Sequence, residues 1–195
     1  MIEELARCLG ASPEPFSRFL QAAVVIPLAE RPAGPAVLLE LRSPALARSP
    51  GEVGLPGGRL EPGEGAWEAG LRELEEELGI PAARVRRLGA LPLFERGRGE
   101  LIHPFVAALQ EPFEVRTSAE VAEAFWLPLA VLRYPGFRKA EICEQARLAG
   151  DFPRRFLPGG SWRRRVRRPT PYLVHEGRLV WGLTAEILAA LAIFL

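Results

Sequence analysis

Acidic residues cluster between positions 73 and 77, where their spacing brings carboxylates together on one side of a predicted helix. With about 100° of rotation per residue, Glu77 lies about 40° and Glu76 about 60° from Glu73 around the helix axis. Three carboxylates on one face repel each other, and Mg²⁺ or Mn²⁺ would remove that repulsion while gaining the oxygen ligands that such ions prefer. The pattern therefore predicts a metal site on this helix.

The alternative interpretation is an acidic helix face that contacts only solvent. Two features favour the metal site. The carboxylate face is flanked by small residues, which let another backbone approach closely: Ala66, Ala69 and Gly70. The helix also follows a glycine-rich turn at Gly57 and Gly58, and glycine permits close approach of the backbone to a ligand.

The other sides of the same helix are expected to attach it to a domain and to face solvent. An apolar stripe lies about 100° to 160° from the carboxylates and consists of Trp67, Leu71, Leu74 and Leu78. Glu68 and Glu75 fall on a third side, which should be exposed. Gly79 and Pro81 stand where a helix is expected to end.

The segment from Gly58 to Ile80 resembles the signature of the Nudix hydrolases. That signature is G-x5-E-x7-R-E-U-x-E-E-x-G-U, where U is aliphatic, and each fixed position is matched at its spacing. The resemblance implies an α/β protein with the Nudix fold, an α/β/α sandwich around a mixed β-sheet. It also implies metal-assisted attack of water on one phosphorus atom of a diphosphate.

The resemblance further implies roles for single residues. The ligands expected for Mg²⁺ or Mn²⁺ are Glu73, Glu76, Glu77 and the backbone carbonyl of Gly57. Arg72 is expected to act in catalysis by orienting the glutamates, and Glu64 to be structural. The general base is either a signature glutamate or a carboxylate from a later loop, for which Glu120 and Glu123 are the candidates. An exposed loop position explains each of these two equally well.

Segments outside the signature resemble the coenzyme A diphosphatase group of this family. Residues 38–44 read LLELRSP and residues 51–58 read GEVGLPGG, close to the group's L-L-x-x-R-S followed by R-x3-G-x3-F-P-G-G. Residues 171–172 and 180–185 resemble the C-terminal end of the same group. The chain departs from the pattern at Leu55 in place of Phe, Glu40 in place of Thr, and Arg48 one residue too close to Gly51.

Coenzyme A carries a diphosphate and a 3′-phosphate, so a protein that binds it needs several cations. Arg42 and Arg48 precede the metal helix and could bind phosphate oxygens, although exposed loop arginines are the simpler interpretation. Gly57 and Gly58 are expected to lie against the substrate. The expected products are 3′,5′-ADP and 4′-phosphopantetheine. The alternatives are cleavage of ADP-ribose or a dinucleotide, or a non-catalytic regulatory module, against which the intact set of carboxylates argues.

A second basic cluster lies between residues 147 and 168, which contain eight arginines and one aspartate. Arg163, Arg165 and Arg167 alternate and so share one strand face, as at a phosphate site or a charged edge strand. Few aromatic residues are interspersed and the net charge is only +1, so nucleic acid is an unlikely partner.

Other polar and aromatic residues have a structural and a functional interpretation. Tyr172 and Trp162 would either join the core or stack on adenine, and the core is the commoner outcome for such residues. His103 is expected to be a structural strand residue. Thr184 is expected near the start of the last helix.

The pattern of apolar runs and turns predicts one Nudix domain over residues 22–195, with a helical segment over residues 1–21 packed on it. The expected strands cover residues 22–28, 36–41, 85–95, 102–110, 124–127, 163–168 and 172–174, and the last helix covers residues 182–195. Its apolar tail is too short to span a bilayer and suggests a homodimer contact. Two cysteines without a disulfide framework and the absence of a signal-peptide pattern fit a cytoplasmic protein.

Overall fold

The computed structural model describes residues 20–96, 99–147, 153–157, 159 and 163–195. The segment expected to be helical over residues 1–21 lies outside this part of the chain, apart from Leu20 and Gln21, which begin the first strand. Trp162 also lies outside it. Within the described residues, no helix is long and apolar enough to cross a membrane.

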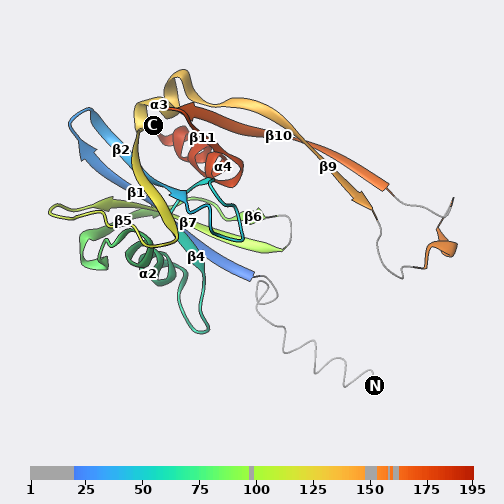
Figure 1. Cartoon of the computed structure of the whole chain (residues 1–195), viewed down its shortest axis with the longest axis horizontal. Coiled ribbons are helices and arrows are strands. Elements are labelled where there is room, and N and C mark those ends of the chain that lie inside the picture. Colours follow the sequence, from blue (N-terminus) through green and yellow to red (C-terminus); the bar gives the residue numbers. More distant parts are fainter. Residues whose placement is uncertain (1–19, 97–98, 148–152, 158, 160–162) are drawn as a thin grey trace.

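A mixed eight-stranded sheet forms the centre of the molecule (Figure 1). Its strand β1 (Leu20–Arg31) pairs in parallel with β7 (Glu100–Leu109) and antiparallel with β2 (Gly34–Arg42). The continuous apolar run in β1 suits this central place, because both faces of such a strand are covered. The remaining strands of this sheet are β3 (Val53–Gly54), β4 (Gly57–Arg59), β5 (Val85–Ala90), β6 (Phe94–Arg96) and β8 (Val121–Pro128). The single strand expected over residues 85–95 is thus two strands.

Helices cover both faces of this sheet, which confirms the predicted α/β/α sandwich. Helix α2 (Ala66–Leu78) lies on one face, where its apolar stripe packs in the same cluster as Val25. Helix α4 (Gly182–Leu191) lies on the other face and packs in the same cluster as Ile26. Adjacent residues of β1 therefore point into two different cores, as the alternation of side chains along a strand requires.

A second, three-stranded sheet was only partly foreseen. It consists of β9 (Arg138–Arg147), β10 (Arg163–His175) and β11 (Arg178–Trp181), all antiparallel. The two short strands expected after residue 162 are one long strand, and β9 was not predicted. Much of the β9–β10 hairpin extends away from the body of the molecule (Figure 1). Because its exposed side chains bury no continuous face, the sequence of β9 lacks the apolar alternation that marks a half-buried strand.

The segment between β2 and α2 contains two very short strands. Strand β3 pairs with β2, and strand β4 pairs with β1. Gly57 pairs with Val24 in β1 and has a φ of 156°, which few residues with a side chain adopt. A Cβ atom at this position would lie 2.2 Å from the carbonyl oxygen of Ala23. Only glycine permits this approach, and the approach holds the turn beside the carboxylate face of α2. A short helix, α3 (Leu129–Val131), follows β8.

Candidate active site

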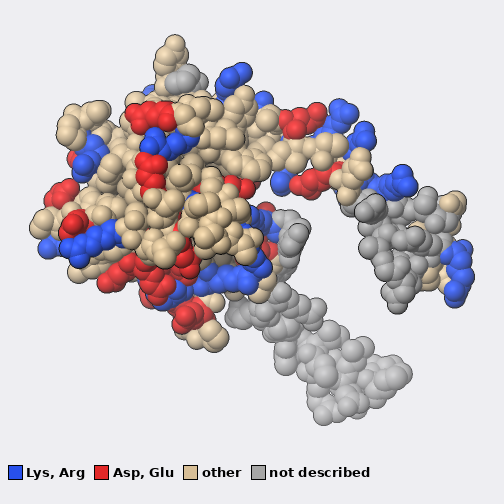
Figure 2. Space-filling view, viewed as in Figure 1, with Lys and Arg blue, Asp and Glu red and all other residues tan. Residues whose placement is uncertain are grey.

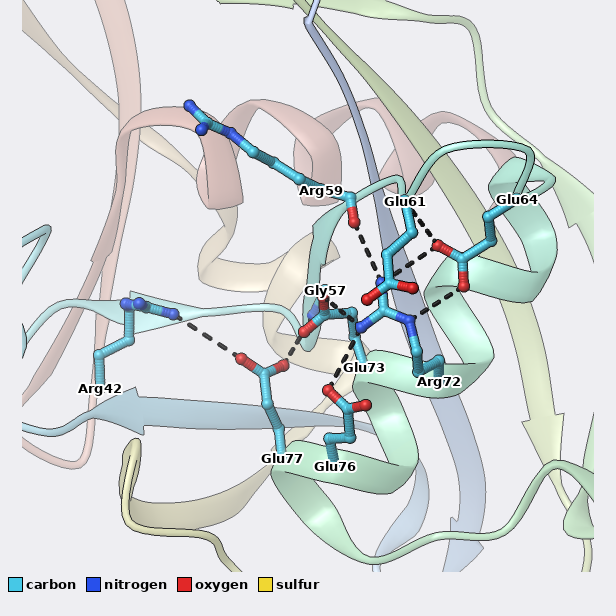
Figure 3. A network of polar contacts seen from close by, with 9 residues as sticks. All are labelled: Arg42, Gly57, Arg59, Glu61, Glu64, Arg72, Glu73, Glu76 and Glu77. Carbon is cyan, nitrogen blue, oxygen red and sulfur yellow. Dashed lines mark hydrogen bonds and ion pairs between the residues drawn. The ribbon is translucent and has the colours of Figure 1, made fainter.

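Arg72 joins three carboxylates on the outer side of α2 (Figure 3). Its Nη1 atom donates hydrogen bonds to Glu73 Oε1 at 2.8 Å and to Glu76 Oε2 at 3.2 Å. Its Nε atom donates to Glu64 Oε1 at 2.9 Å, and Nη2 donates to the other Glu64 oxygen at 3.2 Å. Nη2 also donates to the backbone carbonyl of Arg59 at 3.1 Å. The guanidinium therefore ties the turn before α2 to the helix itself.

The position of Glu64 explains how a residue outside the helix joins this network. Its carboxylate also accepts a hydrogen bond from the backbone N–H of Glu61 at 2.9 Å, so one side chain closes the turn and anchors Arg72. These hydrogen bonds lower the pKa of Glu64, chiefly the one from Arg72. The structural role expected for Glu64 and the orienting role expected for Arg72 stay predictions.

Strand β4 presses directly on the carboxylate of Glu73. A Cβ atom added at Gly58 would lie 2.2 Å from Glu73 Oε1, well inside the contact distance of two such atoms. The small residue at this position therefore leaves room for the carboxylate between the strand and the helix. Glu76 stands further out, with 60% of its side chain exposed.

Glu77 lies on the inner side of the same helix face and is buried, with 5% of its surface exposed. Its Oε2 atom accepts a hydrogen bond of 2.8 Å from the backbone N–H of Gly57. Its Oε1 atom lies 3.9 Å from Nη1 of Arg42. Burial, together with the nearby charge of Glu40, raises the pKa of Glu77 to about 8.

Glu40 adds a carboxylate that the sequence motifs did not mark as functional. It lies in β2, is 1% exposed, and neither of its oxygens has a hydrogen-bond partner among the described residues. Nη1 of Arg42 lies 3.6 Å from Glu40 Oε1. Burial raises the pKa of Glu40 to about 7, and the guanidinium of Arg42 lowers it by less. The signal for this residue was present as its departure from the Thr of the related motif.

Arg42 is thus the cation between two buried carboxylates. It sits at an irregularity in the pairing of β2 with β8, and Gly54 of β3 passes beside the stem of its side chain. A quarter of the side chain is exposed, so the guanidinium borders both the buried pair and the surface of the site. Arg48, the other predicted phosphate ligand, is exposed in the loop between β2 and β3.

The two candidates for a base from a later loop have different surroundings. Glu123 is paired across from Leu41 in β2, and its side chain forms an ion pair with Arg178 of β11. Leu41 belongs to the core under α4, so Glu123 points away from the carboxylates of α2. Glu120 precedes β8, and its backbone carbonyl accepts a hydrogen bond of 2.7 Å from the N–H of Ser43. Its charge contributes to raising the pKa of Glu40.

Three further residues singled out in the sequence lie in β7, β10 and α4. His103 lies in β7, where its Nε2 atom is 2.9 Å from Gln21 Oε1 and burial lowers its pKa. Tyr172 is half-buried, with the guanidinium of Arg138 5.5 Å from its ring centroid. Thr184 lies in the first turn of α4 and donates a hydrogen bond to the backbone carbonyl of Val53 at 3.1 Å.

The arginine cluster of β10 is partly neutralised by its neighbouring strand. Arg167 lies 3.7 Å from Glu141 and Arg168 lies 3.6 Å from Glu144, both in β9. Figure 2 shows basic and acidic side chains side by side along this projecting hairpin. The mixture of signs is typical of a charged, solvated strand edge and not of a surface for a polyanion.

The donor set around α2 suits a hard divalent cation. Its side chains offer carboxylate oxygens, and two of these oxygens, on Glu40, are buried without a hydrogen-bond partner among the residues that the structure describes. In the described part of the chain, no three acidic, histidine or cysteine side chains converge tightly enough to hold one ion together. The reason is visible in Figure 3, where Arg72 draws Glu73 and Glu76 to one side and Gly57 holds Glu77 on the other. The carboxylates are adjacent but separated by the arginines that neutralise them.

Comparisons with known proteins agree on a family. The model described as the NUDIX domain matches residues 19–146. The uncharacterized Nudix hydrolase NudL of Escherichia coli K12 is 35% identical over 176 residues, which cover 89% of this chain and 81% of that protein.

Solved structures show the same fold. A Nudix hydrolase of Mycobacterium smegmatis, RenU, has a TM-score of 0.51 and 25% identity, over 59% of this chain and 74% of that one. A MutT/nudix family protein from Enterococcus faecalis has a TM-score of 0.51 and 16% identity, over 97% of this chain and 67% of that one.

Proposed function

Because the chain belongs to the Nudix hydrolase family, which acts on phosphoric anhydride bonds, we propose that it cleaves the diphosphate of coenzyme A or its derivatives. The products would be 3′,5′-ADP and 4′-phosphopantetheine. One observation carries this choice of substrate. The segment resembling the coenzyme A diphosphatase motif runs directly into the site, since Nη1 of its Arg42 lies 3.9 Å from Glu77 of the signature helix.

We propose Mg²⁺ or Mn²⁺ as the cofactor, held by Glu73, Glu76, Glu77 and the backbone carbonyl of Gly57. Such an ion supplies neutralisation of the diphosphate and acidification of the attacking water. Arg72 orients the outer carboxylates by its hydrogen bonds of 2.8 and 3.2 Å to Glu73 and Glu76. These bonds hold the side chains in place before substrate arrives, which is the usual task of the residues that support metal ligands.

The phosphate groups of the substrate need cations from the protein as well as the metal. Arg42 is in position to donate to a phosphate oxygen, because part of its side chain remains exposed at the rim of the site. Gly57 and Gly58 supply a backbone without side chains against which a diphosphate fits. Arg48 is proposed as a further phosphate ligand from the exposed loop.

For the general base we propose Glu120 ahead of Glu123. A base must come within hydrogen-bond reach of the attacking water. Glu123 is engaged by Arg178 on the α4 side of the sheet, whereas Glu120 adjoins Ser43 and acts electrostatically on Glu40. A signature glutamate, Glu76 or Glu77, stays the alternative base.

The substrate is tested by direct competition among diphosphates. Purified protein is given coenzyme A, ADP-ribose and a dinucleotide polyphosphate, each with Mg²⁺ and with Mn²⁺, and the products are resolved by mass. We expect the highest kcat/KM for coenzyme A and the appearance of 4′-phosphopantetheine. A higher kcat/KM for ADP-ribose or for the dinucleotide would overturn the substrate and leave the hydrolytic chemistry in place.

We also propose that the protein acts in the cytoplasm as a homodimer that forms through its C-terminal elements. Ile193 and Phe194 expose 81% and 74% of their surfaces, and Trp181 is also partly exposed. Such exposed apolar side chains favour association. Light scattering coupled to gel filtration should report twice the chain mass, and Phe194→Ser should shift the population toward the monomer.

A further inference from the structure

Glu40 is a buried carboxylate whose charge is poorly compensated. Both oxygens are inaccessible to solvent, and among the described residues neither has a hydrogen-bond partner. Its only ion pair with a described residue is with Arg42, at 3.6 Å, which is longer than a hydrogen bond. A buried ionised group without hydrogen bonds destabilises a fold strongly, so a protein that retains one usually has a use for it.

Glu40 lies beside helix α2, which carries the proposed metal ligands. Glu40 lies on the α2 side of β2, and it is paired with Gly54 of β3 and Ala124 of β8. A Cβ atom at Gly54 would lie 3.4 Å from Glu40 Oε1, so this strand passes directly beside the carboxylate. The strand thereby directs the carboxylate toward the inner end of the acidic helix face.

Glu40 and Glu77 both lie near the same guanidinium nitrogen of Arg42. Nη1 of Arg42 lies 3.6 Å from Oε1 of Glu40 and 3.9 Å from Oε1 of Glu77. One oxygen of each carboxyl group thus lies within 4 Å of the same nitrogen, and when both carboxyl groups are ionised the three groups together carry a net charge of −1. Carboxylate oxygens on two sides of one point are the ligands that a divalent cation takes.

We propose that Glu40 is an additional ligand of the metal centre, which binds a divalent cation together with Glu77 at the place now taken by the guanidinium of Arg42. This inference rests on the proposed metal-dependent function. With an ion held by Glu40 and Glu77, the guanidinium of Arg42 would be free to donate to a phosphate oxygen of the substrate. Glu40 therefore links two events, binding of the ion and release of the phosphate-binding arginine.

The alternative is a structural Glu40 that merely holds Arg42 in place. The two ideas differ in what happens without substrate. A ligand contributes to the affinity for the ion itself, whereas a structural residue contributes to folding and to the position of Arg42. Metal affinity of the substrate-free protein therefore separates the two roles.

The test is a titration of the metal-free full chain with Mn²⁺. Binding is measured by calorimetry or by the paramagnetic resonance of the free ion. Glu40→Gln keeps the shape of the side chain, and Glu40→Thr introduces the residue usual in the related motif. We expect both variants to bind Mn²⁺ about tenfold or more weakly than the unaltered protein. Glu30→Gln, at an exposed position of β1, is the matched control and should bind as the unaltered protein does.

Thermal unfolding with and without Mn²⁺ gives a readout that does not depend on activity. The rise in Tm caused by Mn²⁺ should shrink in both Glu40 variants, whereas their metal-free Tm should be equal to or higher than that of the unaltered protein. Arg42→Met should bind Mn²⁺ more tightly, because the competing charge is removed. Unchanged Mn²⁺ affinity in Glu40→Gln, or weaker binding in Arg42→Met, would overturn the inference.

These outcomes are distinguishable from failure of the proposed substrate. If the protein prefers ADP-ribose while Glu40→Gln binds Mn²⁺ weakly, the substrate proposal fails and the metal ligand stands. If coenzyme A is cleaved while the Glu40 variants bind Mn²⁺ normally, the proposed function stands and Glu40 is structural.

Discussion

The two arginines of the site hold their glutamates in opposite ways. Arg72 lies at the outer edge of α2 and reaches its acceptors at 2.8 to 3.2 Å, including Glu64 and Glu73. Arg42 lies between two buried carboxylates at 3.6 and 3.9 Å, distances that leave ion pairs without hydrogen bonds. The outer cluster consists of Arg72 with Glu64, Glu73 and Glu76, and the inner cluster of Arg42 with Glu40 and Glu77. In the outer cluster the arginine donates hydrogen bonds to each carboxylate, whereas in the inner cluster it makes ion pairs at longer distances.

The difference shows which part of the site is complete and which part needs a ligand. In the outer cluster, water and hydrogen bonds weaken the repulsion between carboxylates, so the arrangement is stable by itself. In the inner cluster the same charges interact more strongly, because the surrounding protein screens them less. The outer cluster therefore positions side chains, and the inner cluster has the larger gain from a bound cation.

Removal of charge from the inner cluster should have the largest effect on activity. Glu77→Gln keeps the shape of a buried side chain and loses a proposed metal ligand, so we expect kcat to fall roughly 1000-fold, or about 4 kcal/mol. Glu75→Gln, on the exposed side of the same helix, is the control and should keep its activity. Steady-state kinetics on the best diphosphate substrate measures kcat of both variants, and circular dichroism checks that they fold. Retention of more than a tenth of the activity by Glu77→Gln would contradict the inner cluster as the metal centre.

Disruption of the outer cluster should come second. Arg72→Gln removes the donors to Glu64, Glu73 and Glu76 but no proposed ligand, so we expect a loss of kcat of about 100-fold, near 3 kcal/mol. The Mn²⁺ concentration needed for half-maximal rate should rise as well, because the carboxylates are no longer held. Arg86→Gln, exposed on β5, provides the comparison. An Arg72 variant with normal metal dependence would show that the outer cluster does not position ligands.

The pH dependence of the free energy of unfolding should depend on the carboxyl groups of the inner cluster, Glu40 and Glu77. In the unfolded chain Glu40 and Glu77 titrate near 4.5, and in the folded protein their pKa values are raised to about 7 and about 8. The folded state therefore holds protons that the unfolded state has released, so stability falls as the pH rises above about 4.5 and the loss is complete above about 8. Glu64, whose pKa is lowered, stays ionised across this range.

We expect the metal-free protein to be several kcal/mol less stable at pH 8.5 than at pH 5.5, since both carboxyl groups lose their protons between these values and one pKa unit corresponds to about 1.4 kcal/mol. Urea unfolding in the presence of a chelator measures this difference. Added Mn²⁺ should remove most of the loss at pH 8.5, and Glu40→Thr should flatten the curve. Stability that is equal at both pH values would place the inner carboxylates in a wetter setting than their burial indicates.

The smallest expected effect tests the contact between β4 and the outer cluster. In Gly58→Ala the added methyl group would meet the end of the Glu73 side chain, which can swing away. We therefore expect a loss of kcat of about tenfold and little change in Tm, because the obstacle is flexible. In Gly57→Ala the obstacle is the backbone of β1, so here Tm should fall as well. Equal Tm losses in the two variants would contradict the distinction.

Local periodicity was enough to predict the part of the site that lies on α2. The helix repeat places Glu73, Glu76 and Glu77 on one face without knowledge of any other element, because each position follows from hydrogen bonds within the helix. The same holds for the long apolar strands and for the helix end at Gly79, which has a left-handed φ of 68°. In contrast, β9 was missed, since its exposed sequence carries no such pattern.

Contacts between distant segments could not be predicted in this way. Alternation along β2 shows that Leu38 and Glu40 share a face, but not that this face lies under α2 beside Glu77. The partner of Glu123 in β11 likewise depends on a strand 55 residues further along the chain. These contacts follow from sheet order and from the crossing of a helix over it.

The spacing of residues in the chain thus established the family chemistry: a helix with carboxylates on one face and apolar residues on another, after a glycine-rich turn. Packing of β2, β3 and β4 against that helix established which of the carboxylates are buried and which arginine neutralises each. The physical reason is that helical periodicity is a local property, whereas desolvation of a charge depends on every segment that covers it. The assignment of Glu40 to the metal centre comes from that second kind of information.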